Sequence, residues 1–129
     1  MSGRSRGFTL IELVMVIALL AVLLGIAVPG YRAQVIATRE AVLKTNLSLM
    51  RERLDQYKAD KEKWPPSLAG LVEAGYFKEM PTDPITQSAT WQEIMSEPDP
   101  AQPNAEPGVE DVKSLSEEIG LDGRPYKEW

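Results

Sequence analysis

One carboxylate, Glu12, stands near the start of an apolar run in which no other side chain is charged. The run extends from Gly7 to Gly30 and reads GFTLIELVMVIALLAVLLGIAVPG. An acid at the centre of a membrane helix costs about 2.5–3.5 kcal/mol on insertion scales, so its presence calls for a compensating partner. No basic residue follows Glu12 within the run. We therefore expect the partner to come from the start of the chain, from water or from another molecule.

The rest of the chain offers little catalytic chemistry. The whole chain of 129 residues contains no cysteine and no histidine. This excludes disulfides, thiolate metal sites, the usual zinc sites and histidine-based triads. Asp55, Asp60, Glu73 and Asp83 are possible acid–base pairs, but nothing in the sequence places any two of them in one cleft. We therefore predict that the protein is not an enzyme.

Charge and length narrow the function further. The formal net charge is −5, and most of the acids lie in the second half of the chain, where they would repel a phosphate backbone. This argues against nucleic-acid binding. Once the apolar run is set aside, the remaining chain is long enough for only one small domain.

The apolar run is long enough to cross a bilayer. Counted from Phe8 it has about 21 residues, or roughly 31 Å of helix. It follows a short basic leader, MSGRSRG, whose Arg4 and Arg6 favour a cytoplasmic start. Three interpretations compete: a cleaved signal peptide, a plain anchor, and a segment that needs the acid. The run exceeds an ordinary signal-peptide core, and a signal peptide does not explain Glu12. In a plain anchor, Glu12 lies near one end of the run and could be hydrated at the membrane interface.

The helix is predicted to continue well beyond the apolar run. Apolar residues recur at helical spacing in an amphipathic stripe, and Trp64-Pro65-Pro66 stops the pattern. We predict one helix from about residue 8 to 63, with Gly25 and Pro29 marking a bend or local unwinding. The stripe consists of Leu43, Leu47, Met50, Leu54 and Tyr57.

The second half of the chain predicts short elements. Ser67 can cap a helix over residues 67–77, with Gly75 in its C-terminal turn. Residues 90–95 and 109–114 are predicted strands, joined by a proline-rich exposed connector. Tyr126 and Trp129 are expected to cover the core. The predicted fold class is α+β, with a long N-terminal helix packed on a small antiparallel sheet.

The segment from Gly7 to Tyr31 resembles the N-terminal signature of type IV pilins and of the pseudopilins of type II secretion systems. Residues 63–91 resemble the G-type major pseudopilin more weakly. The resemblance implies a pilin-like fold with three parts: a cleaved leader (1–7), a transmembrane and filament-core helix (8–30) and a periplasmic domain (31–129). It implies cleavage between Gly7 and Phe8 by a prepilin peptidase, followed by N-methylation of Phe8. Pro29 falls where the family carries its helix-bending proline.

This resemblance supplies a partner for Glu12. Cleavage creates an amine at Phe8, and an ammonium and a carboxylate in a low dielectric attract each other strongly. We expect Glu12 to meet the amine of a neighbouring subunit and so to set the register of a helical filament. The implied location is the bacterial inner membrane, crossed once, with the filament in the periplasm. The implied partners are membrane lipid, identical subunits, the inner-membrane assembly platform and minor pseudopilins.

The C-terminal loop is the one place where a cofactor is implied. Resembling pseudopilins bind calcium in a loop that corresponds here to SLSEEIGLDG, residues 114–123. The resemblance implies that the ligands here are the Leu115 carbonyl oxygen and the carboxylates of Glu118 and Asp122. These are hard oxygen ligands suited to Ca²⁺. Glu118 stands where Asp is usual, and the paired terminal acids are replaced by RPYKEW. The alternative is that these acids accept hydrogen bonds from turn amides.

Two other functions remain open at this stage. One is a type IV pilus subunit that forms a surface fibre, although such pilins often carry a C-terminal disulfide loop. The other is a membrane-anchored binding domain that never polymerises. The favoured function is a structural pseudopilin of a type II secretion system.

Overall fold

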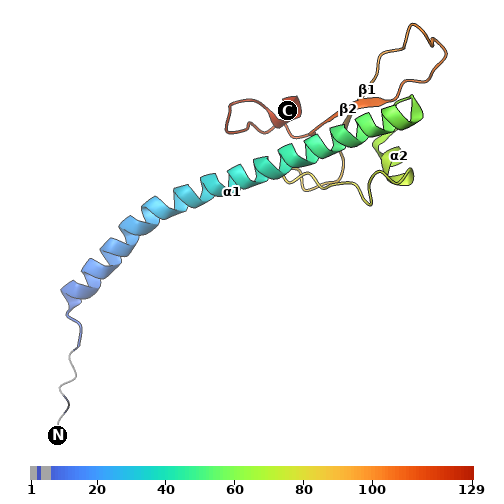
Figure 1. Ribbon diagram of the computed structural model, residues 1–129. Coiled ribbons are helices and arrows are strands. Elements are labelled where there is room, and N and C mark those ends of the chain that lie inside the picture. Colours follow the sequence, from blue (N-terminus) through green and yellow to red (C-terminus); the bar gives the residue numbers. More distant parts are fainter. Residues whose placement is uncertain (1–2, 4–6) are drawn as a thin grey trace. The chain divides into compact units, whose positions relative to one another are not determined.

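The computed structural model describes residue 3 and residues 7–129, so most of the predicted leader lies outside the described residues. The elements follow in the order α1 (Leu10–Lys61), α2 (Leu68–Glu73), β1 (Gln92–Met95), β2 (Val109–Lys113) and a 3₁₀ turn, η1 (Tyr126–Glu128) (Figure 1). The predicted α+β fold, a long N-terminal helix with a small antiparallel sheet, is confirmed. Contacts divide the chain into two units between Ile36 and Ala37. The boundary predicted after residue 30 rests on membrane thickness and stays a prediction.

The first unit is a bare apolar helix. Every side chain from residue 7 to 34 is exposed, and α1 is long and apolar enough, by length and composition, to cross a membrane. The chain remains helical through Gly25 and Pro29, so of the two predicted features the local unwinding does not occur, and the bend stays a prediction. Pro29 removes one backbone donor, and the flanking turns keep the helix intact.

The second unit is organised around the predicted stripe of α1. All five stripe residues, from Leu43 to Tyr57, are buried. They pack with residues of α2, the sheet and η1, including Leu71, Trp91, Val112 and Tyr126. Trp64 and Trp129 pack against this core, which confirms a packing role for the aromatic residues. Burial of such side chains is the main source of stability in a domain of this size.

The helix α2 is shorter than predicted, but the predicted N-cap, Ser67, and the predicted C-terminal glycine, Gly75, are both found at its ends. The Ser67 side chain accepts a hydrogen bond from the Gly70 N–H at 3.2 Å, as an N-cap does. Gly75 has a φ of 86° in the turn that follows the helix, a conformation that favours glycine. The turn begins soon after Glu73 because this φ cannot continue an α-helix.

The two strands form an antiparallel pair in which Gln92 lies opposite Lys113 and Glu93 opposite Val112. A bulge between Ile94 and Met95 shifts the register at the end next to the connector. At that end Gly108 lies against the chain that leaves α1. A Cβ atom on Gly108 would come within 2.6 Å of the Trp64 Cβ and 2.8 Å of the Pro65 carbonyl oxygen. Only glycine fits this contact without displacing backbone.

Asp83 is fully buried and joins the loop after α2 to the end of β2. Its Oδ1 atom accepts the Ile85 N–H at 2.8 Å, and its Oδ2 atom accepts the Ser114 hydroxyl at 2.5 Å. A buried carboxylate is costly unless its oxygens are hydrogen-bonded in this way. Asp83 is therefore a structural residue and is not one half of an acid–base pair.

Candidate functional site

The first turn of α1 fixes the surroundings of Glu12. Thr9 Oγ1 accepts the Glu12 N–H at 3.3 Å, and the Thr9 carbonyl oxygen accepts the Leu13 N–H at 3.2 Å. Threonine followed three residues later by glutamate is the spacing of a capping box. The Glu12 carboxylate also lies at the positive end of the helix dipole. Thr9 therefore caps α1, and Glu12 lies in its first turn, a position that the sequence analysis did not consider.

The cap also corrects the predicted start of the helix. Phe8 was predicted inside the helix, on the same face as Glu12, but α1 begins at Leu10. The Thr9 side chain competes for the first free amides and ends the helix on its N-terminal side. Gly7 and Phe8 precede the helix, and Phe8 is 89% exposed. The bond between these two residues is therefore accessible in the described chain.

Nothing in the described part of the chain neutralises Glu12. The ion pairs found among residues 3 and 7–129 all lie beyond residue 50. Glu12 is exposed on the same bare segment as the apolar side chains. Its charge and this apolar surface are therefore both available to a second molecule.

The predicted calcium ligands of the C-terminal loop have other partners in the structure. Both Asp122 carboxylate oxygens are bonded to Arg124: Oδ1 accepts its N–H at 3.0 Å, and Oδ2 pairs with Nε at 2.9 Å. These bonds lower the pKa of Asp122 from its ordinary value of 3.8, and the hydrogen bond from the Arg124 backbone has the larger effect. The Glu118 carbonyl oxygen accepts the Tyr126 N–H at 2.9 Å. Leu115, whose carbonyl oxygen is the third predicted ligand, is 46% exposed.

These contacts count against the predicted calcium site, which stays a prediction. One of the predicted ligands, the Asp122 carboxylate, already faces the Arg124 guanidinium, whose charge would repel a cation. In the part of the chain that the structure describes, no three acidic side chains come together as a metal cluster. Asp122 accepts the amide of its own turn, which is the alternative that the sequence left open.

The residue that the sequence analysis missed is Glu40. It is only 8% exposed, and its Oε1 atom accepts the Leu121 N–H at 2.7 Å and the Tyr126 hydroxyl at 2.8 Å. By sequence, Glu40 precedes Lys44 by four residues, a spacing that gives only a weak helix-surface pair. Yet Glu40 lies three residues before Leu43, so it continues the buried stripe by one step. That spacing was the signal that could have identified it.

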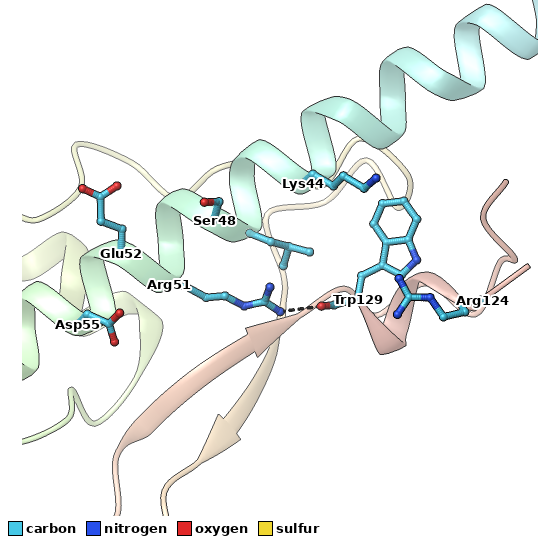
Figure 2. Close-up of a pocket in the computed structure, with 8 residues that line it drawn as sticks. Lys44, Ser48, Arg51, Glu52, Asp55, Arg124 and Trp129 are labelled. Carbon is cyan, nitrogen blue, oxygen red and sulfur yellow. Dashed lines mark hydrogen bonds between the residues drawn. The ribbon is translucent and has the colours of Figure 1, made fainter. Parts of the chain in front are cut away.

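A second contact between α1 and the C-terminal segment lies at Arg51. Its Nε atom pairs with Asp111 Oδ1 at 2.7 Å, and its Nη2 atom donates to the main-chain oxygen of Trp129 at 2.9 Å. Figure 2 shows this bond in an open groove of about 580 Å³. The Lys44 ammonium lies 4.9 Å from the centre of the Trp129 ring. The charged groups of the groove thus hold the tail on the helix.

The Tyr126 hydroxyl provides a pH test of this arrangement. Burial, and then the bond to Glu40, raise the pKa of Tyr126 to about 12 from 10.0. A raised phenol pKa stabilises the fold below pH 10, and that contribution is lost as the pH rises toward 12. We expect the free energy of unfolding to fall over this range by an amount on the order of 2 kcal/mol. Denaturant titrations of wild type and Tyr126→Phe measure the difference, and equal pH slopes for the two proteins would contradict it.

Comparison with known proteins places these features. The prokaryotic N-terminal methylation motif matches residues 2–28. Type II secretion system core protein G of Klebsiella pneumoniae is 30% identical over 97 residues, which cover 63% of this chain and 69% of that protein. The Escherichia coli K12 protein of the same name is 30% identical over 99 residues, covering 64% and 68%. The type IV major pilin protein PilA of Myxococcus xanthus is 33% identical over 61 residues, covering 47% and 28%. No solved structure matched.

A capped apolar helix with a methylation motif, continued into a small α+β domain, defines the class of pilin-like proteins. Within that class, the relatives that align over the longest stretches share one name. The chain belongs to the family of type II secretion system core protein G. The expected resemblance to the G-type major pseudopilin is confirmed, and the shorter match to a type IV pilin makes a pilus subunit the weaker alternative.

Proposed function

We propose that this protein is a structural subunit that polymerises from the bacterial inner membrane into a periplasmic filament of a type II secretion system. The observation that carries the proposal is the exposed, apolar first segment of α1 with a single acid, Glu12, which no residue among 3 and 7–129 neutralises. Such a surface is stable in lipid or against other copies of itself, and it is unfavourable in water. Identical subunits that meet head to tail give an open helical assembly.

Charge pairing supports a defined register in this filament. An amine released at Phe8 would meet Glu12 of the adjoining subunit, because a lone carboxylate surrounded by apolar helices is strongly unfavourable. The accessible Gly7–Phe8 bond supports cleavage by a prepilin peptidase, and the methylation motif supports N-methylation of Phe8. The buried, hydrogen-bonded Asp83 supports a structural role over an enzymatic one.

The remaining partners follow from membrane anchoring. Residues 8–30 would rest in lipid before assembly, and the domain from residue 31 would lie in the periplasm. The assembly platform of the inner membrane would extract the subunit, and minor pseudopilins would cap the filament. The family name of the relatives supports this setting, since it places those proteins in a type II secretion system.

The test is the mass of the polypeptide recovered from membranes of cells that contain a prepilin peptidase. We expect intact mass spectrometry to show loss of residues 1–7 and gain of one methyl group on Phe8. The matched control is the same protein from cells without the peptidase, which should retain the leader. A membrane-derived chain that still begins at Met1 in the presence of the peptidase would overturn the proposal, because the amine that pairs with Glu12 would not exist.

A further inference from the structure

We infer that the C-terminal segment, residues 114–129, is built around an anion, the Glu40 carboxylate, and folds without a divalent cation. The segment turns hydrogen-bond donors inward. The Leu121 N–H and the Tyr126 hydroxyl converge on Glu40 Oε1 at 2.7 and 2.8 Å. A calcium site has the opposite polarity, because it needs oxygen atoms turned inward on a cation.

The chain packs tightly around this carboxylate at Gly120. A Cβ atom on Gly120 would lie 3.2 Å from Glu40 Oε1 and 2.9 Å from Trp129 Cζ2. The absence of a side chain therefore lets the loop backbone approach the helix closely enough for the Leu121 N–H to reach Glu40. Tyr126 and Trp129 close the other side, with their rings 5.0 Å apart.

Several oxygens of this segment already accept hydrogen bonds from the protein. The carbonyl oxygens of Ser116, Glu118 and Gly120 accept backbone N–H groups of Lys127, Tyr126 and Gly123 at 2.9–3.0 Å. Two cationic side chains stand near the remaining acids: Arg124 on Asp122 at 2.9 Å and Lys127 on Glu117 at 3.8 Å. Positive charge at this loop is thus supplied by arginine and lysine.

The position of Glu40 on α1 explains why one carboxylate is enough. Glu40, Lys44 and Arg51 project from one side of the helix at steps of four and seven. Each contacts the tail: Glu40 at Leu121 and Tyr126, Lys44 at the Trp129 ring, and Arg51 at the Trp129 oxygen. The helix therefore provides a row of fixed charges along which the tail is held.

The experiment measures the melting temperature of the full chain in detergent micelles by tryptophan fluorescence, in millimolar EGTA and in millimolar Ca²⁺. We expect the wild-type melting temperature to be the same in both buffers, within about 1 °C, since a ligand stabilises only if it binds the folded state. Glu40→Gln should lower it by about 5 °C in both, because the charge-assisted hydrogen bonds are lost.

Two further variants keep the result decisive. Glu52→Gln makes the same chemical change on an exposed residue of the same helix, and should shift the melting temperature by less than about 1 °C. Tyr126→Phe removes one of the two donors and should lower it by less than Glu40→Gln does, which preserves the comparison if Glu40→Gln does not fold.

A rise of several degrees with Ca²⁺ in the wild type would overturn the inference. Equal melting temperatures for Glu40→Gln and Glu52→Gln, or for Tyr126→Phe and wild type, would also overturn it. The melting temperature is independent of filament assembly, so failure here leaves the proposed function untouched.

Discussion

A Glu12→Val variant is expected to insert into the membrane and to be cleaved after Gly7, yet to form essentially no filaments. Valine is apolar, so insertion becomes easier, whereas the amine of each incoming subunit loses its partner. Removing one partner of a buried charge pair leaves the other charge uncompensated. This costs about 3–5 kcal/mol in assembly free energy at each contact, and the contact repeats along the filament. Electron microscopy and a shearing assay for assembled protein measure the outcome. Normal filaments from this variant would contradict a register set by charge.

The place of Glu12 in the first turn of α1, three residues after the Thr9 cap, requires a second variant. Glu12→Gln keeps a side chain that can complete the capping box but removes the negative charge. If pairing with the Phe8 amine sets the register, this variant also fails to assemble. If Glu12 serves only to begin α1, Glu12→Gln assembles as wild type does, and the charge-pairing model is then excluded. Ile17→Val, a small apolar change in the same exposed segment, is the matched control and should assemble normally.

The substitution with the largest expected effect on stability is Gly108→Ala. The added methyl would lie 2.6–2.8 Å from the Trp64 Cβ and from two main-chain oxygens. These atoms cannot move away cheaply, because the Pro65 oxygen also accepts the Val109 N–H at 2.8 Å. We expect a loss of about 3 kcal/mol or more in the free energy of unfolding, comparable with severe overpacking. Urea denaturation followed by tryptophan fluorescence measures it.

The matched control for this change is Gly70→Ala. Gly70 lies inside α2, and the nearest atom to an added methyl is Pro66 Cδ at 3.5 Å, an ordinary contact. Alanine favours helix by up to about 1 kcal/mol over glycine, so this variant should be neutral or more stable. If Gly108→Ala is as stable as Gly70→Ala, Gly108 does not lie as close to Trp64 as described here.

Much of the fold could be predicted from local pattern. The stripe from Leu43 to Tyr57 specified which face of α1 is buried, because helical periodicity is a short-range signal. Ser67 and Gly75 marked the ends of the short helix, although the left-handed turn at Gly75 left it shorter than expected. The strands were found to within two residues, and the α1 start was missed by two because a threonine cap was read as helix.

The contacts of the tail could not be predicted in this way. Glu40 meets Leu121 and Tyr126 across 81 and 86 residues, and no local pattern encodes which amide will reach a given carboxylate. An acid on a buried stripe suggests a partner without identifying it. The calcium prediction was left open for a different reason: Arg124 and Asp122 are only two residues apart, but whether they pair depends on the conformation of the turn.

The separation of these contacts has a consequence for export. Arg51 and the main-chain oxygen of Trp129 are 78 residues apart, so the domain cannot close until nearly the whole segment has been delivered to the same compartment. Contacts of such range make the final folding step slow relative to helix formation. Before that step the stripe of α1 would be uncovered. If the domain lies in the periplasm, as proposed, these contacts would suit a route in which the polypeptide crosses the membrane unfolded and completes its domain on the far side.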